Sequence, residues 1–143
     1  MTTPPRIVAA TPRARAALGY LHANCASCHD ARGPLGTTLG LDLAQRVAAP
    51  ASPGAPLPTA SGVPSRFRPP GLAGREGVPL RIAPGDPAGS VLLRRLAAKD
   101  PTTRMPPLGR HLPDAAALEL LAGFVRLDLA PARPDTPSPE AKQ

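Results

Sequence analysis

The distribution of proline limits most strongly what this chain can fold into. Of its 22 prolines, seven lie between Pro50 and Pro70, where glycine, alanine and serine fill much of the remaining sequence. Proline lacks a backbone donor and clashes with the helical turn before it, so neither a helix nor a central strand continues through such a run. The sequence therefore predicts a long irregular loop over residues 45–75, with regular structure on either side of it.

In three regions outside this loop, a helix-starting signal is followed by apolar residues at helical spacing. The starting signals are Thr11-Pro12, Asp86-Pro87 and Asp114. Side-chain oxygens of Thr and Asp cap helices, and proline is favoured in the first helical turn. The sequence thus predicts an all-α fold, with three helices over residues 12–28, 87–99 and 114–129.

The chain has 143 residues, a length that corresponds to one domain. We expect this domain to occupy residues 11–130, after a linker at 1–10 and before a disordered tail at 131–143. Within the domain, residues 32–36 are expected to form a cluster of turns, and Leu80–Ile82 a short strand-like segment that lines the site.

A cluster of reactive side chains lies near the predicted end of the first helix, in the sequence Cys25-Ala26-Ser27-Cys28-His29. The pattern C-x-x-C-H is the attachment signature of c-type haem. Residues three apart at a helix end point the same way, so both thiols can form thioethers with the two vinyl groups of one macrocycle. The imidazole that follows is then placed to ligate the iron from the proximal side. The motif predicts one covalently bound haem c, with Cys25 and Cys28 as its tethers and His29 as the first axial ligand.

Other roles for the two cysteines stay open at this point. A thioredoxin-like redox pair lies near a βαβ pattern, and none surrounds this motif. Structural zinc normally takes four ligands, whereas the chain has only two cysteines. A plain disulfide between Cys25 and Cys28 is the simplest alternative. The protein would then be a haem-free helical module, for example a truncated gene product.

Met105 is the candidate for the second axial position of a haem iron. It is the only methionine besides Met1, and Pro106 and Pro107 follow it and stiffen the backbone. His/Met ligation raises the reduction potential of the iron. His111 is the rival ligand, and an open sixth position is the third alternative.

Taken together, these motifs resemble those of monohaem class I cytochromes c. The stretches that carry the resemblance are Tyr20-Leu-His-Ala-Asn-Cys25-Ala-Ser-Cys28-His29, Ile82-Ala-Pro-Gly-Asp86-Pro87 and Met105-Pro-Pro-Leu-Gly109. More narrowly, they are similar to cytochrome c domains at the C-terminal end of larger exported bacterial proteins. The resemblance covers residues 11–129 and implies three core helices around the haem, with the N- and C-terminal helices crossing. It also implies an electron-transfer protein or domain rather than an enzyme.

We therefore expect one-electron transfer through a haem whose axial ligands are His29 and Met105. The protein would perform no bond-making chemistry itself, because the cofactor carries the electron and the fold tunes its potential. If the Met105 position is vacant or its side chain is easily displaced, the same chain would instead be a haem-based gas sensor or binder.

The formal charge of +7 arises from 17 basic and 10 acidic residues and has two interpretations. It either steers the protein toward an acidic partner or reflects a general abundance of arginine. Arg104 and Arg110, which flank Met105, are the arginines that we expect nearest to the site. The expected partner is a redox protein or a covalently linked dehydrogenase domain. Nucleic-acid binding is not expected, since the chain has almost no aromatic residues for base stacking.

The haem motif also predicts a compartment, because haem is generally attached to C-x-x-C-H outside the cytoplasmic membrane. We expect a periplasmic or otherwise exported protein. Residues 1–10 lack the apolar core of a signal peptide, and no apolar run reaches the length of a membrane span. The expectation is therefore that the true start, or a longer exported chain, lies upstream of Met1.

Overall fold

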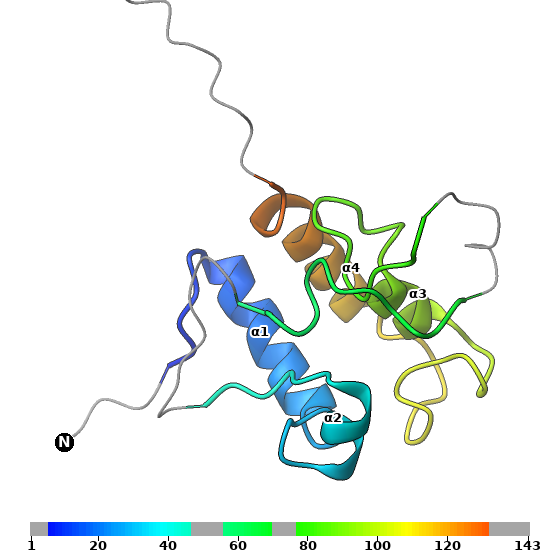
Figure 1. The fold of residues 1–143 in the computed structure, drawn as a ribbon. Coiled ribbons are helices and arrows are strands. Elements are labelled where there is room, and N and C mark those ends of the chain that lie inside the picture. The colour runs from blue at the N-terminus through cyan, green and yellow to red at the C-terminus, as the bar shows by residue number, and fades with distance from the viewer. Residues whose placement is uncertain (1–5, 47–55, 70–76, 132–143) are drawn as a thin grey trace, which may run out of the picture.

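The computed structural model describes residues 6–46, 56–69 and 77–131. Within these residues it contains four α-helices, one π-helical segment, and isolated bridges but no longer strand. The predicted all-α class is confirmed (Figure 1). In chain order the elements are α1 (Pro12–Cys25), α2 (Pro34–Leu39), α3 (Val91–Ala97), α4 (Ala115–Gly123) and η1 (Phe124–Asp128).

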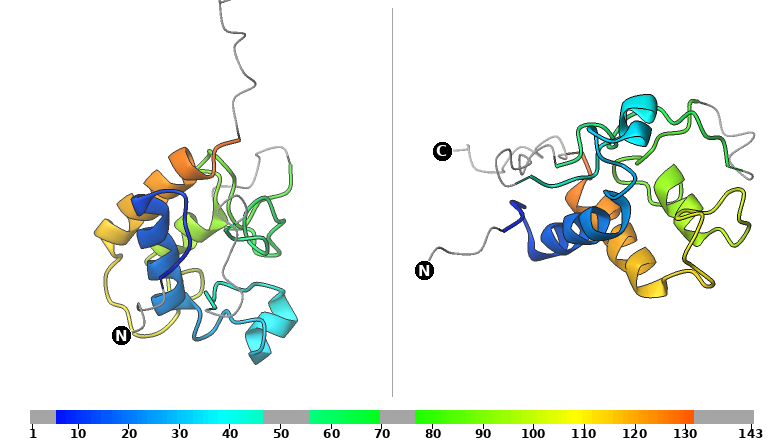
Figure 2. Two further views of the ribbon diagram at one scale, coloured as in Figure 1. Left: turned by 90° about the vertical axis from the view of Figure 1, so that its left-hand side faces the viewer. Right: turned by 90° about the horizontal axis from the view of Figure 1, so that it is seen from below.

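The centre of the fold is the crossing of α1 with α4 and η1, and α3 packs against α4 (Figures 1 and 2). Apolar side chains from these four elements form one buried cluster, which the connecting segments complete. Burial of such side chains is the main favourable term in folding. The largest fully buried ones are Leu18, Leu21, Leu43, Leu57, Ile82, Leu121, Phe124 and Val125.

A single carboxylate joins the start of α1 to the end of η1. Asp128, with a side chain only 5% exposed, accepts a hydrogen bond from Arg13 Nε at 2.6 Å. It also accepts one from Thr11 Oγ1 at 2.5 Å. Thr11 Oγ1 in turn accepts from the Ala14 amide at 3.0 Å, which is the N-cap that the sequence predicts. The Asp128 carboxylate therefore supports the N-cap of α1 and also joins α1 to η1.

The structure confirms where the first and last predicted helices start. Asp114 Oδ1 accepts from the Ala117 amide at 2.9 Å and caps α4 as predicted. The first helix ends at Cys25 rather than at residue 28. The amides of Cys28 and His29 both donate to the Cys25 carbonyl, so the regular helical hydrogen-bond pattern does not continue. The last helix changes from α to π geometry after Gly123 and ends at Asp128.

The second predicted helix, over 87–99, starts too early and is longer than the observed α3. Asp86 caps a turn and not a helix, since its Oδ1 accepts from the Gly89 amide at 2.9 Å. The helix begins only after Ser90, which is fully buried. Its hydroxyl accepts from the Ala83 amide at 2.9 Å and donates to the Asp86 carbonyl at 2.8 Å. These bonds close the turn before the helix starts.

The helix α2 is absent from the prediction, which expected turns over 32–36. Pro34 occupies its first turn, and Gly40 ends it in the left-handed conformation, with φ of 59°. Gly36 faces the turn that follows the cysteine motif, and a Cβ at this position would lie 1.7 Å from the Asp30 carbonyl oxygen. Only glycine allows α2 to approach that turn so closely.

The predicted loop over 45–75 is described in part, and its residues 56–69 form no helix. It is nevertheless not a purely surface segment, since Leu57 and Ala60 are buried in the core. This stretch forms isolated bridges with Leu80–Ile82, which is therefore strand-like as predicted.

The predicted linker and tail fall mostly outside the described residues. Of residues 1–10, the part from Arg6 onward is described, and Ile7 and Ala9 pack against the core. This part therefore belongs to the domain. Of the predicted tail, 131–143, only Pro131 is described. No described helix combines the length and apolar character that crossing a membrane would require.

Two glycine substitutions test this packing. Gly36→Ala should lower the free energy of unfolding by about 3 kcal/mol or more, because the new methyl group meets backbone that cannot move aside. The matched change Gly19→Ala, in the middle of α1, meets only the Ile7 side chain at 3.6 Å. It should raise the free energy of unfolding by about 0.5–1 kcal/mol through helix propensity. Urea unfolding followed by circular dichroism measures both; equal effects would contradict the contact at Gly36.

Candidate functional site

The four residues singled out from the sequence, Cys25, Cys28, His29 and Met105, line one cavity. Its volume is about 200 Å³, and it is open to solvent on one side. Most of its wall is aliphatic, formed by Leu21, Leu39, Leu41, Leu43, Val91, Leu92, Leu96 and Leu121.

The cysteine motif lies at the cavity because the last residue of α1, Cys25, is part of the cavity wall. The amides of Cys28 and His29 both donate to the Cys25 carbonyl, at 3.1 and 2.8 Å. The chain thus curls tightly around the end of the helix, and all three residues line the cavity. Both cysteines are free thiols, with Cys25 partly buried and Cys28 exposed.

Burial makes the charged forms of two of these groups unfavourable. It raises the pKa of the Cys25 thiol to about 11, with a further contribution from Cys28. Burial also lowers the pKa of His29, and the nearby Arg95 and Arg81 guanidiniums lower it further. At neutral pH the site therefore presents a thiol and an uncharged imidazole, the form of histidine that binds metals.

His29 has an unpaired nitrogen inside the protein. Its Nδ1 atom is buried and has no hydrogen-bond partner among the described residues. Buried polar atoms are nearly always paired, so such an atom calls for a specific explanation. The backbone of the same residue is well anchored, since its carbonyl accepts from the Leu43 amide at 2.8 Å.

Ion pairs hold the segment that follows the motif. Arg46 donates to Asp30 and to Asp42, each at 2.7 Å. The Arg32 amide, which donates to Asp30 at 2.8 Å, is the main cause that lowers the pKa of that carboxyl group. The residue next to His29 is thus tied to the chain on both sides of α2.

Met105 approaches the cavity from the loop between α3 and α4. Its amide donates to the Arg95 carbonyl at 2.9 Å. His111, the rival candidate, is exposed and is not part of the cavity wall. His22 is also exposed, and its Nδ1 accepts from the Gln45 amide at 3.2 Å. Of the residues considered as a second ligand, the structure therefore brings only Met105 to the motif.

Three arginines on the cavity wall, Arg66, Arg81 and Arg95, were not singled out from the sequence. None of them pairs with a carboxylate within the described ranges. Burial lowers the pKa of Arg81 and of Arg95, and the charge of Arg66 lowers that of Arg81 further. The wall thus carries positive charge without a carboxylate partner in this part of the chain.

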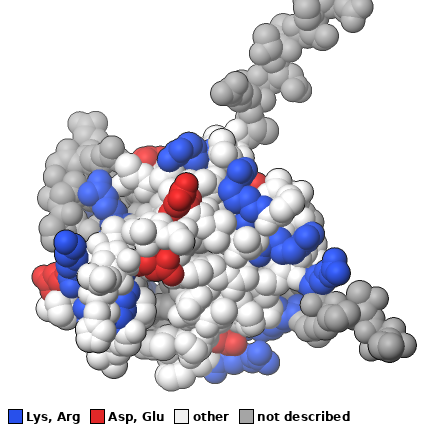
Figure 3. All heavy atoms as spheres, turned by 180° about the vertical axis from the view of Figure 1, so that it is seen from behind, with Lys and Arg blue, Asp and Glu red and all other residues white. Residues whose placement is uncertain are grey.

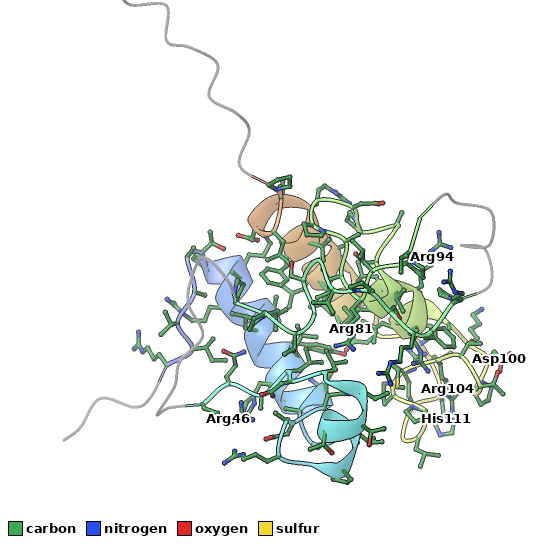
Figure 4. The ribbon with its side chains drawn as sticks, viewed as in Figure 1. Arg46, Arg81, Arg94, Asp100, Arg104 and His111 are labelled. Carbon is green, nitrogen blue, oxygen red and sulfur yellow. The ribbon has the colours of Figure 1, made fainter. Side chains whose placement is uncertain are left out.

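Backbone and ring contacts keep two of these arginines in place. Arg81 donates to the carbonyls of Gly40 and Thr59, each at 2.7 Å, and lies near the centre of the molecule in Figure 4. The Arg95 guanidinium lies 4.1 Å from the centroid of the Phe67 ring. The predicted strand-like segment 80–82 was the only signal in the sequence that pointed toward this wall.

Comparisons with known protein families, curated proteins and solved structures find no match for this chain. Within the described residues, no three or more His, Cys, Asp or Glu side chains are grouped so that they could hold a metal ion.

Tyr20 offers a probe of the cavity wall, since it is the only tyrosine of the chain. Burial raises its pKa above 10.0, and so does Asp114, whose Oδ2 accepts from its hydroxyl at 3.3 Å. Asp114→Asn retains a capping side chain but removes the negative charge. We expect the pKa of Tyr20 to fall, while burial still keeps it raised. A ¹³C NMR titration of the labelled ring measures it.

The control for this titration is Glu119→Gln, which removes an exposed charge from the same helix. It should leave the titration midpoint of Tyr20 unchanged. A midpoint that responds to neither substitution would show that Tyr20 and Asp114 are not in contact in solution.

Proposed function

We propose that this chain binds one haem covalently and transfers single electrons. Cys25 and Cys28 would form the two thioethers, and His29 and Met105 would ligate the iron. The observation that supports the proposal best is that these four residues, from two distant parts of the sequence, line the same cavity. No catalytic residue is part of the proposal.

The donor set fits such a group. The half-buried imidazole of His29 is uncharged at neutral pH, which is the form of histidine that binds metals. Two free thiols at the end of one helix can be held against a single macrocycle edge. The soft thioether of Met105 suits the other axial position.

The cavity wall fits the remainder of the group. A haem is a large, mostly apolar body with two carboxylates, and it supplies an iron centre that cycles between two oxidation states. The aliphatic wall would exclude water from it. Arg66, Arg81 and Arg95 would provide the positive charge that its carboxylates need.

We propose that the electron passes to a redox protein or to a covalently linked dehydrogenase domain, outside the cytoplasmic membrane. One face of the molecule gives little support to strong steering. On the face seen in Figure 3, basic and acidic side chains are interspersed. Arg104 is engaged within its own loop, where its Nη2 donates to the Pro107 carbonyl at 3.1 Å.

The first test of this proposal is covalent attachment. The chain is expressed behind a secretion signal in a host that matures c-type cytochromes. Its denaturing mass spectrum should show the polypeptide plus one haem. Cys25→Ala and Cys28→Ala should each leave one thioether or none, whereas Ser27→Ala, an exposed change between them, should load fully. Haem that extracts into acidic organic solvent would refute the proposal.

A second test concerns the axial ligand. The oxidised protein should show the weak near-infrared band of a methionine–iron bond. Met105→Ala should abolish this band, admit carbon monoxide and lower the potential by part of the roughly 0.8 V that axial ligands span.

The matched control is His111→Ala, which alters an exposed side chain of the same loop and should leave the spectrum unchanged. The opposite pattern would make His111 the ligand. Wild-type protein that binds carbon monoxide readily would instead favour a gas sensor or binder.

A further inference from the structure

The loop between α3 and α4, residues 98–114, carries Met105 but buries little of its own apolar surface. Its two leucines point to solvent, with Leu108 81% exposed and Leu112 77% exposed. The loop lies at the side of the molecule, where Figure 4 labels Arg104 and His111. Apolar packing by these side chains does not fix it, so its position depends on polar contacts.

Arg95, in the last turn of α3, makes two of these contacts. Its carbonyl accepts from the Met105 amide at 2.9 Å, and its Nε donates to the Thr103 carbonyl at 2.8 Å. Both contacts join the middle of the loop to the helix. They leave the far end of the loop, beyond the two prolines, to be held by something else.

Arg110 holds that far end. Its Nη1 donates to the Leu96 carbonyl and its Nη2 to the Ala98 carbonyl, at the C-terminal end of α3. The last carbonyls of a helix lack intrahelical partners, and a cation is favoured there. The planar guanidinium can reach two carbonyls at once, which the single ammonium of lysine does less well.

We propose that Arg110 is a positioning residue for Met105. By joining the far end of the loop to the end of α3, it closes the segment that contains Met105 and keeps the thioether at the cavity. Closing a loop costs conformational entropy, and the two hydrogen bonds offset that cost. This inference rests on the proposed function, in which Met105 ligates the iron.

The experiment compares three variants of the haem-loaded protein. Arg110→Gln removes the charge and the two-carbonyl contact, and Arg110→Lys keeps the charge alone. Arg94→Gln is the control, because Arg94 lies in the same last turn of α3 but donates to the Ala88 carbonyl, away from the loop. All three are measured by the near-infrared methionine band, by the affinity for added imidazole, and by hydrogen exchange of the Met105 amide.

We expect Arg110→Gln to weaken the band and to raise the affinity for imidazole about tenfold or more, since loss of a charged hydrogen bond has about this weight. The Met105 amide should exchange faster in the same variant. Arg110→Lys should lie between this variant and wild type, and Arg94→Gln should match wild type. If Arg110→Gln does not mature, Arg110→Lys alone decides, by the same three measurements.

The proposed ligand set and the proposed role of Arg110 can be refuted separately. A wild-type protein that lacks the methionine band would refute the proposed ligand set. A wild-type protein that has the band, together with Arg110 variants that keep its intensity, its imidazole affinity and its amide exchange, would refute the role of Arg110. An equal effect of Arg94→Gln would also refute it, because charge at the helix end would then be the cause.

Discussion

The crossing of α1 over α4 and η1 is the contact on which the remainder of this structure depends. α1 ends in the cysteine motif, and α4 begins where the Met105 loop ends. Whatever fixes these helices against each other also fixes the distance between the two halves of the site. Buried leucines and Phe124 provide most of that contact, and Asp128 joins the outer end of α1 to the end of η1.

The parts of this fold that could be predicted are those that depend on neighbours in the sequence. Thr11 and Asp114 cap helices because an oxygen lies within reach of amides three residues on. The Asp86-Pro87 signal is equally good locally, yet it fails, because the buried Ser90 hydroxyl closes a turn there. The close approach of Gly36 to the Asp30 carbonyl cannot be predicted from the spacing of apolar residues in the sequence. In the cavity, the C-x-x-C-H pattern pointed to the cysteines and His29, whereas the arginines of the wall come together only on folding.

Arginine side chains in this protein also hold backbone segments together, a role that the net charge of the chain does not reveal. In a sequence with so many prolines, many backbone carbonyls have no amide of a regular element to pair with. Guanidinium groups take that place: Arg81 joins three segments through carbonyls, and Arg95 and Arg110 do the same around the Met105 loop. These three arginines are therefore engaged within the domain, which their scattered positions in the sequence do not reveal.

The contact between Gly36 and the Asp30 carbonyl has a consequence for the ancestry of this chain. Any side chain at position 36 would push α2 away from the turn directly after His29, so a glycine is needed seven residues after the histidine. The spacing from the histidine to this glycine is thus a mark that descent would preserve even where the side chains around it drift. A glycine at this interval after a C-x-x-C-H pattern is therefore a feature to look for when other sequences are compared with this chain.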